Sequence, residues 1–457
     1  MTVETVGIEK ITPEMRKGSS RSSFNLWFAA NLTIADFALG FIPLSLGMNF
    51  SSALLSIIIG NILGATIVGL SAIMGPRTGY PQMMSTTNSM GAEVMRAFGL
   101  VNLSNTVGWF IINNVLAVEA LYLIFRVSYV FLLLIFVGVV FVVAYIGHDF
   151  IHRLEKILSY ILGILFLIIF IYIIVTGKMD TIVPGNISIG LSFLFMVAIS
   201  YSYLMSWGPY ASDYSRYLPE NTSQKKLFSY VFSGSFISTT FVEIVAISIS
   251  FILLNSTLSA MGSLQLISGR YAVIALFAIV LGGISANVLN LYSSSLSGLV
   301  GGIRMKRTTF VGVVAVVGLI LSIIFYNGFY SFFEDFLLIL AYWISPWVAI
   351  LVVDFLVFRN YQLKFDRNFI FAGVFSYLSG LMVSVPFMNP GIPSLNIMNW
   401  SVTTTYYPQY FSRMLGGVDI SYFVSIIVSA LLYFAIKKYS RTGTRGESVQ
   451  VPNTTFK

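Results

Sequence analysis

Long apolar stretches dominate this chain of 457 residues and limit what it can fold into. Twelve of them reach the length of about 20 largely apolar residues that a helix needs to cross a bilayer. The predicted spans are 24–48, 51–75, 102–125, 127–147, 155–176, 187–209, 228–254, 271–301, 308–326, 329–357, 368–389 and 416–437. Only 10% of the residues are charged, against roughly 25% in soluble domains. The sequence therefore predicts an all-α polytopic membrane protein, and it excludes a soluble enzyme, a nucleic-acid binder and a disordered scaffold.

The basic residues predict how the spans are oriented. The loops that join even to odd spans, together with both tails, hold 22 of the 26 Lys and Arg residues. The opposite side holds only Arg126, Lys178, Arg270 and Arg413. The positive-inside rule then places both termini in the cytoplasm of a multi-pass protein of the cell membrane. This topology, with contact to anionic lipid, explains the net charge of +8 without a nucleic-acid partner.

Residue types that support chemistry are scarce. The chain has no cysteine and two histidines, His148 and His152, which removes disulfides, thiolate ligands and a histidine-based metal site. No nucleophile–base pair is evident, so we expect no catalytic residues and no enzymatic activity. No resident cofactor and no obligate protein partner are expected either. The first 23 residues are polar and charged, unlike a cleavable signal sequence.

Two predicted spans carry residues that interrupt a helix. In the first span an otherwise apolar helix is interrupted by Asn31, Thr33, Asp36, Gly40 and Pro43, and Pro43 cannot donate its backbone hydrogen bond. In the sixth span, Ser206 precedes Gly208 and Pro209. Breaks five spans apart are typical of transporters built from two inverted five-helix repeats, in which unwound backbone binds a cation and a polar substrate. The alternative for the first span is a kinked helix in which a neighbouring side chain pairs with the Asp36 carboxylate.

The third and eighth spans add polar side chains at the predicted midplane. Trp109 and Asn113 share one helix face, where an indole and a carboxamide suit a flat heteroaromatic ligand. A lone Trp is also common as packing. In the eighth span, Asn287 and Asn290 lie near the small residues Gly282, Gly283, Ser285 and Ala286. These small residues permit close helix packing, but hydroxyls and carbonyls there also suit Na⁺.

Four further charged positions receive simpler predictions. Glu243, in the middle of the seventh span, is either a protonation site or a buried hydrogen-bonded group. Asp213 and Arg216 are expected to form a salt bridge or gate latch at the cytoplasmic end rather than a substrate site. Asp354, near an inner helix end, is expected to be solvated.

Three sequence segments resemble the nucleobase:cation symporter-1 family, the purine, cytosine and hydantoin permeases. They are GPRTGYPQMMSTTNSMGAEVMRAFG (75–99), ASDYSRYLP (211–219) and NVLNLYSSSLS (287–297). With NLTIADFALG in the first span, the similarity covers most of the chain. The resemblance implies twelve transmembrane helices: a LeuT-like 5+5 inverted repeat plus two peripheral helices. The chain would then divide into a cytoplasmic tail (1–23), two repeats (24–176 and 187–357), spans eleven and twelve (368–437) and a disordered tail (438–457).

The resemblance also implies where substrate and cation bind. Trp109 matches the family's stacking tryptophan and Asn113 its polar residue one turn later. Carbonyls at about Ala30 and Ile34, with Gly282, Ser285 and Ala286 of the eighth span, match its cation ligands, so Na⁺ is a candidate there. The remaining predicted substrate contacts are Ala35, Asp36, Leu204, Ser206, Trp207, Asn287 and Asn290.

Three positions depart from the family pattern. Ala286 lacks the hydroxyl often found there, which weakens the case for Na⁺ and strengthens that for a proton. Leu204 stands where some members have a second aromatic residue, so the second wall is apolar or Trp207 replaces it. Asp36 is unusual, and with Glu243 it is a candidate proton site.

The resulting expectation is a secondary active importer that couples a Na⁺ or H⁺ gradient to uptake of a nucleobase or related heterocycle by alternating access. Purines, cytosine, uracil, hydantoin and allantoin are the substrate types considered. A rival keeps the fold and uses Asp36 to bind a cationic amine or amino acid. A passive channel and a membrane-embedded enzyme or sensor are more remote, because the polar residues cluster near the midplane and no soluble domain is evident.

Overall fold

The computed structural model describes residues 3–176, 190–254, 258–326, 329–358, 367–388, 410–415 and 418–441. Within these ranges the chain is helical throughout and contains no strand. The long helices are α4 (Phe50–Ala72), α7 (Ala92–Phe125), α8 (Tyr129–Ile146), α9 (His148–Thr176), α10 (Leu191–Met205), α12 (Gln224–Ile252), α14 (Ala272–Val300), α15 (Arg307–Ile324), α16 (Phe329–Val353), α17 (Arg367–Ser384) and α19 (Ser421–Arg441).

Shorter helices connect or precede these. They are α1 (Ser20–Ala30), α2 (Ile34–Leu39), α3 (Ile42–Ser45), α5 (Met74–Thr78), α6 (Thr86–Met90), α11 (Ser212–Ser215), α13 (Ala260–Ser268) and α18 (Tyr410–Met414). A 3₁₀ turn at Gly208–Tyr210 lies between α10 and α11, and a π-helical turn at Asp354–Phe358 ends α16.

The structure bears out the predicted spans. Among the described residues, 11 helical segments are long and apolar enough to cross a membrane. A bent pair, Ser20–Ala30 and Ile34–Ser45 at 53°, makes the twelfth. The predicted third span begins earlier than expected, at Ala92, and the eighth is preceded by the separate helix α13. The predicted tail at 438–457 lies mostly outside the described residues.

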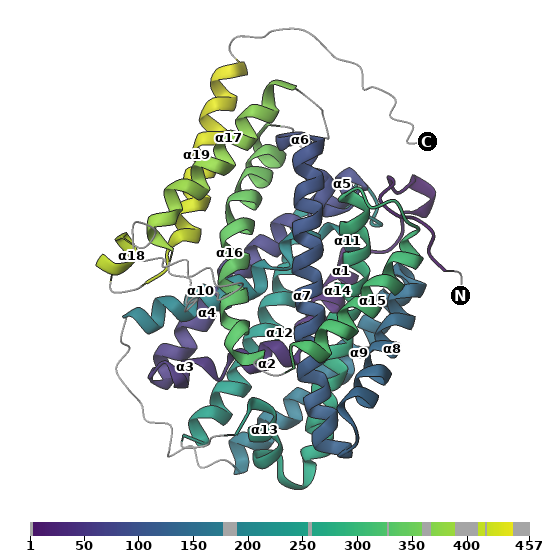
Figure 1. Ribbon diagram of the computed structural model, residues 1–457, viewed down its shortest axis with the longest axis vertical. Helices are drawn as coiled ribbons and strands as arrows, with labels where there is room; N and C mark the ends of the chain where they lie inside the picture. The colour runs from purple at the N-terminus through teal and green to yellow at the C-terminus, as the bar shows by residue number, and fades with distance from the viewer. Residues whose placement is uncertain are drawn as a thin grey trace.

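The helices form one bundle with a peripheral pair (Figure 1). Helices α7 and α14 pack along each other at its centre, and α4 packs on both α10 and α12. Helices α17 and α19 pack on each other at one edge and reach the bundle through α16 and α6, while α8 and α9 lie at the opposite edge. This is the predicted arrangement of ten core helices and two peripheral ones.

Small residues bring α4 and α10 into close contact. A Cβ at Gly60 would lie 2.7 Å from the Cβ of Ser200, and one at Gly64 would lie 2.6 Å from the Cβ of Leu204. Glycines one turn apart let two membrane helices approach at backbone distance. This packing fixes the face that α10 presents to α4, and therefore the face that it presents to the middle of the bundle.

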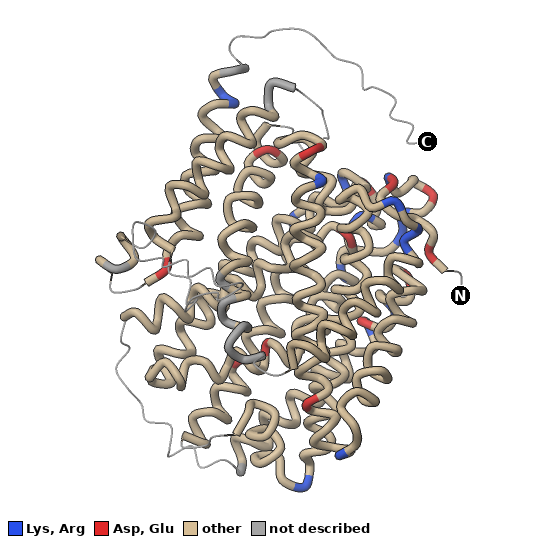
Figure 2. Tube along the Cα trace, viewed as in Figure 1, with Lys and Arg blue, Asp and Glu red and all other residues tan. Residues whose placement is uncertain are grey.

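The surface of the bundle suits lipid on its sides and water at its ends. Large apolar side chains of α9, such as Ile164, Leu167 and Ile168, are about half exposed, and α15 is similar. Lys and Arg instead gather at the end of the bundle that carries the N terminus (Figure 2), called here the N-terminal end. A soluble protein would bury such apolar stripes, so they mark a membrane-facing surface.

Candidate functional site

The first span is broken within the segment that the sequence predicts, sharply at Asn31–Thr33 and again at Gly40–Phe41. Helix α1 ends at Ala30 and α2 begins at Ile34, with Asn31, Leu32 and Thr33 between them. The Asn31 amide donates to the Trp27 carbonyl at 2.8 Å, and the Thr33 hydroxyl caps α2 by accepting from the Asp36 amide at 3.3 Å. The three linking residues are fully buried. Backbone polar groups that no helix uses are therefore present inside the bundle.

The sixth span is broken as well. Helix α10 ends at Met205, and the chain continues through the turn at Gly208–Tyr210 into α11. The Ser206 hydroxyl donates to the Tyr203 carbonyl at 2.6 Å and so stabilises the last turn of α10. The break lies at the Ser-Trp-Gly-Pro segment that the sequence singled out.

The two breaks meet each other. The hydroxyls of Thr33 and Tyr203 lie 3.1 Å apart and share a hydrogen bond. The rings of Trp27 and Trp207 pack edge to face with centroids 5.5 Å apart. Two broken helices that converge inside a membrane bundle are the usual setting for a transported ligand.

Trp109 lies beside this junction, on α7. Its ring makes edge-to-face contacts with Tyr203 of α10 and Phe336 of α16, at centroid distances of 5.3 and 5.4 Å. The Asn113 amide donates to the Trp109 carbonyl at 3.0 Å. The Trp109 Nε1 and the Asn113 Oδ1 are both buried and have no hydrogen-bond partner in the structure. One donor and one acceptor are thus left open one helical turn apart.

The two asparagines of α14 are held in a network. The Asn287 amide donates to the Asn114 Oδ1 at 2.8 Å and to the Phe110 carbonyl at 3.0 Å. Asn290 donates to the Asn287 Oδ1 at 3.3 Å and accepts from the Tyr210 hydroxyl at 3.1 Å. These amides join α14 to α7 and to the end of the sixth span, so they lie at the predicted place with their polar groups largely occupied.

The predicted second wall of the site is formed by different residues. Leu204 points to α4, where it packs on Gly64. Trp207 packs on Trp27 and Tyr210. Tyr203 lies against Trp109 instead. The sequence analysis missed Tyr203 and Phe336, because the rotation of a helix next to a break cannot be read from spacing alone.

Asp36 and Glu243 form a buried pair of carboxylates. Asp36 and its neighbour Ala35 lie on α2, fully enclosed, and the Asp36 carboxylate lies near the Glu243 carboxylate of α12, with neither of its oxygens in a hydrogen bond. It also interacts with the phenol of Tyr203, on the side of Trp109. The Glu243 Oε2 accepts from the Asn61 amide of α4 at 2.5 Å. The structure thus brings together the two candidate proton sites.

The predicted cation ligands lie where α1, α14 and α9 meet. Ala30 ends α1, Ile34 begins α2, and Ala286 is buried on α14. Gly282 of α14 faces the Leu32 carbonyl so closely that a Cβ would collide with that oxygen. Ser285, one turn later, donates its hydroxyl to Glu155 of α9. Glu155 did not emerge from the sequence analysis.

Arg216 and Asp213 do not pair with each other at the N-terminal end, contrary to the salt-bridge expectation. Arg216 pairs with Glu4 of the N-terminal tail at 3.7 Å and donates to the Gly7 carbonyl at 2.8 Å. Asp213 accepts from the Gln82 amide at 2.9 Å, and burial raises its pKa to about 6. Glu4 also accepts hydrogen bonds from Tyr217, Tyr292 and the backbone amide of His148. The cluster therefore still acts as a latch, because it ties the N-terminal tail to several helices.

The prediction for Asp354 is wrong. Its side chain is buried between α16 and α19, where it pairs with Lys437 and accepts from the Tyr433 hydroxyl at 2.6 Å. This ion pair adds to the packing by which α17 and α19 lie against α16 and α6. The sequence could not show it, because the two residues are distant along the chain and belong to separate spans.

A membrane bundle whose first and sixth spans break and converge on polar side chains is a secondary transporter by its fold, not an enzyme. Residues 10–425 match the family described as permeases for cytosine/purines, uracil, thiamine and allantoin, and the chain belongs to that family. The resemblance seen in the sequence is thereby confirmed.

Individual relatives agree with this assignment. YxlA of Bacillus subtilis (strain 168) is 28% identical, with 96% of each chain covered. The vitamin B6 transporter TPN1 of Saccharomyces cerevisiae is 27% identical, and the match covers 79% of this chain and 67% of TPN1. The purine-cytosine permease FCY2 of Saccharomyces cerevisiae (strain ATCC 204508 / S288c) is also 27% identical, and the match covers 79% of this chain and 72% of FCY2. Among solved structures, the nucleobase-cation-symport-1 transporter Mhp1 in a closed conformation with bromovinylhydantoin bound has a TM-score of 0.75, 16% identity and 96% coverage of both chains.

Proposed function

We propose that this protein imports a flat heterocycle of the nucleobase type by cation symport and alternating access. The family supports the substrate class, since the relatives include a purine-cytosine permease, a vitamin B6 transporter and a transporter with a bound hydantoin. All of these ligands are planar rings with polar atoms on their edges. The broken spans support the transport mechanism, because such helices frame the midplane site of rocking-bundle transporters.

The observation that carries the proposal is the pair of open groups beside Trp109. The Trp109 Nε1 is a donor and the Asn113 Oδ1 an acceptor, and both are buried without partners. Leaving such a group unpaired costs about 1–3 kcal/mol. A heterocycle that presents one acceptor and one N–H along its edge would satisfy both, with Tyr203 and Phe336 enclosing its ring.

The N-terminal end is the proposed cytoplasmic face, as the positive-inside rule requires. In this state the tail residue Glu4 joins α8 and α9 to Arg216, Tyr292 and Arg307, and so bridges elements of both predicted repeats. Opening toward the cytoplasm would have to break these contacts. The structure therefore fits a state in which the inner end is closed.

A cationic amine is the second candidate substrate. The buried Asp36 carboxylate lies near Tyr203 and has no ion-pair partner among the described residues. An amine would supply that partner. An Asp36→Asn variant should then lose substrate binding altogether, whereas a transporter of neutral bases should still bind its substrate, with an affinity lowered by about tenfold at most.

Ligand-induced thermal stabilisation of the purified protein tests the proposed function. Cytosine, adenine, uracil, hydantoin, pyridoxine and primary amines would be screened, because any ligand of the native state raises its apparent stability. We expect at least one heterocycle to stabilise the wild type and Trp109→Ala to abolish the effect. Trp343→Ala is the matched control, since Trp343 stacks on Phe98 of α7, away from the α1–α2 break. Stabilisation by amines alone, or by no compound, would overturn the proposal.

A further inference from the structure

Glu243 of α12 is a buried acid that faces a second acid. Its side chain is fully enclosed, as is that of Asp36 on α2, and the two carboxyl groups are close enough to repel each other when both are charged. The other buried acids differ, because Asp354 pairs with Lys437 and Glu155 accepts from a serine hydroxyl. Two facing carboxylates that water does not reach cannot both ionise without a large cost, so such a pair tends to hold a proton.

The backbone keeps the two acids together. Gly40, one turn after Asp36, packs so closely on α12 that a Cβ would lie 2.8 Å from the Glu243 carbonyl oxygen and 2.5 Å from the Cβ of Ala246. Helix α2 therefore cannot turn Asp36 away from α12 without giving up this contact. Two charged carboxylates would strain the packing, whereas a proton between them removes the repulsion.

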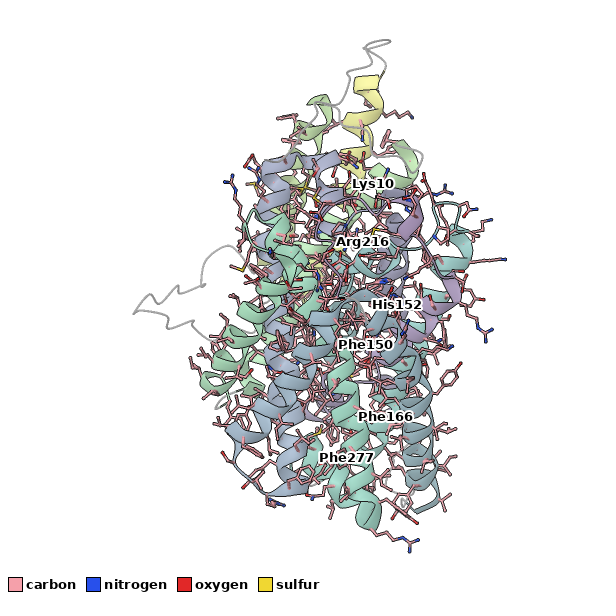
Figure 3. The ribbon with its side chains drawn as sticks, turned by 90° about the vertical axis from the view of Figure 1, so that its right-hand side faces the viewer. Lys10, Phe150, His152, Phe166, Arg216 and Phe277 are labelled. Carbon is pink, nitrogen blue, oxygen red and sulfur yellow. The ribbon has the colours of Figure 1, made fainter. Side chains whose placement is uncertain are left out.

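No basic side chain compensates the pair. Within the described ranges, no ion pair includes Asp36 or Glu243. The helices that pack on α2 and α12 are α1, α3, α4, α7, α9, α13 and α14. In this part of the chain, the titratable groups that act on the pair are the two carboxyls themselves and the Tyr203 phenol of α10. Figure 3 shows three basic side chains toward the N-terminal end of the bundle, namely Lys10, His152 and Arg216.

The surroundings of Glu243 favour a proton over a metal ion. The Asn61 Nδ2 of α4 donates to Glu243 and to the Thr240 hydroxyl, at 2.5 and 3.2 Å. N–H groups aimed at this point would repel a metal cation. A proton on Glu243 needs only one acceptor, and the Asp36 carboxylate, whose two oxygens have no hydrogen-bond partner, supplies it.

We propose that Glu243 binds a proton, that it donates this proton to the Asp36 carboxylate, and that the proton is linked to substrate binding. The pair with its proton carries one negative charge and keeps α2 against α12. Loss of the proton adds a second charge and pushes α2 away. The proposal rests on the proposed symport function and adds a proton to it, whether or not Na⁺ binds at the predicted cation ligands.

A short chain of contacts connects the pair to the substrate site. The Asp36 backbone amide donates to the Thr33 hydroxyl at 3.3 Å, and that hydroxyl shares a hydrogen bond with Tyr203. Tyr203 in turn packs on Trp109. A shift of α2 would therefore displace Tyr203 from the ring on which we propose that the substrate rests. Proton binding and substrate binding would then favour each other, and the affinity for a neutral heterocycle should rise as the pH falls.

Infrared spectroscopy of the purified protein tests for the proton without any substrate. A protonated carboxyl has a carbonyl stretch that a carboxylate lacks, and this band shifts in heavy water when its proton exchanges. We expect one such band to be lost in Glu243→Gln and kept in Glu155→Gln, which makes the same chemical change at another buried acid. Size-exclusion profiles and thermal unfolding establish that each variant is folded.

The pH dependence of substrate binding tests the link. Uracil and hydantoin are suitable probes, because both stay uncharged in mildly acidic and neutral buffers. Above the titration of Glu243, wild-type affinity should fall by up to about tenfold for each unit of pH, as linkage to one proton requires. Gln at position 243 copies the protonated acid and can donate to Asp36. Glu243→Gln should therefore bind at every pH as the wild type does in acid, while Glu155→Gln keeps the wild-type pH dependence.

The outcomes separate this proposal from the proposed function. Infrared bands that are the same in wild type and Glu243→Gln overturn the proposal, and so does an equal pH dependence of binding in the two proteins. Uptake of ²²Na⁺ that Glu243→Gln abolishes would also overturn it, because the pair would then bind a metal ion. If the band is lost as expected but no heterocycle binds, Glu243 holds the proton and the proposed substrate class fails. If heterocycles bind the wild type equally at every pH, the substrate class stands and the linked proton fails.

Discussion

Two buried acidic regions of this bundle differ in what surrounds them. Asp36 and Glu243 lie across from each other; the Asn61 amide of α4 donates to Glu243, and both Asp36 oxygens have no hydrogen-bond partner. Glu155 accepts from the Ser285 hydroxyl, and no ion pair among the described residues includes it. Two facing carboxylates cannot both ionise cheaply, so we expect the first region to hold a proton or to bind an amine. An isolated buried carboxylate without a basic partner is compensated by its own proton or by a bound cation, so we expect the second region to behave differently.

Asp354 is a third buried acid, and it differs from the other two regions because a lysine is its partner. Removal of this lysine is expected to have the largest effect. Lys437→Met should lower the free energy of unfolding by about 3–5 kcal/mol, because it leaves Asp354 buried without its cation. Transport per folded molecule should stay unchanged, since the pair lies between α19 and the end of α16 opposite to Phe336. Thermal unfolding and uptake assays would check this, with the exposed Lys438→Met as control. If the folded variant transports substrate without the cation, the expectation fails, because a carboxylate that is paired with a lysine would then also take part in ion coupling.

Gly282→Ala is expected to have the next largest effect. The added methyl group would meet the Leu32 carbonyl, and overpacking of this kind costs about 1–3 kcal/mol. Applied to the cation site, that cost corresponds to about 5–150-fold weaker Na⁺ binding. Gly283→Ala is the matched control, because its Cβ would lie 3.3 Å from the Cβ of Ala117 on another face. If the two variants bind Na⁺ with equal affinity, the Leu32 carbonyl is not a ligand of the cation.

Asp36→Asn should sharpen the contrast between the two regions. It removes one of the facing acids, so we expect Na⁺ binding to change by less than about twofold and heterocycle binding to weaken by about tenfold. Glu243→Gln should have a smaller effect on the heterocycle, and the double variant should be non-additive because the two groups share one environment. Isothermal titration calorimetry measures the affinity of each variant for Na⁺ and for the heterocycle. A large loss of Na⁺ binding in Asp36→Asn would contradict this expectation, because it would show that the two acidic regions act as one binding site.

The smallest effect concerns Glu4, an acid outside the spans. Burial alone would raise the pKa of the Glu4 carboxyl, but Arg307 and Arg216, helped by Tyr217, hold it below its usual value. Its contribution to stability is therefore complete above the ordinary carboxyl pKa and is lost as the pH falls through the lowered one. Glu4→Gln should cost on the order of 1 kcal/mol near neutral pH and less in acid. Thermal unfolding against pH checks this, with exposed Glu14→Gln as control. A pH profile identical to that of the wild type would exclude the pairing.

The sequence predicts the fold better than the site, for a physical reason. Apolar runs and the alternation of basic loops establish the spans, and Gly, Pro and Ser locate both breaks. The orientation of a side chain next to a break depends on how the unwound segment turns, so Tyr203 replaces Leu204 beside Trp109. Glu155 is the first residue of the predicted span 155–176, and nothing in the local sequence distinguishes a buried acid there from one exposed at a helix end. Asp354 and Lys437 are 83 positions apart, a distance that no local pattern bridges.

The docked tail has a practical consequence for anyone who produces this protein. Residues 4–17 run across the N-terminal end and bond to Ile146, Gly79 and Tyr217 through their backbone. A purification tag or fluorescent reporter fused ahead of them would compete with that docking and favour release of the tail. Transport rates measured on such fusions would then describe an altered resting state. A fusion at the C terminus, beyond α19, leaves these contacts intact and is the better choice for quantitative work.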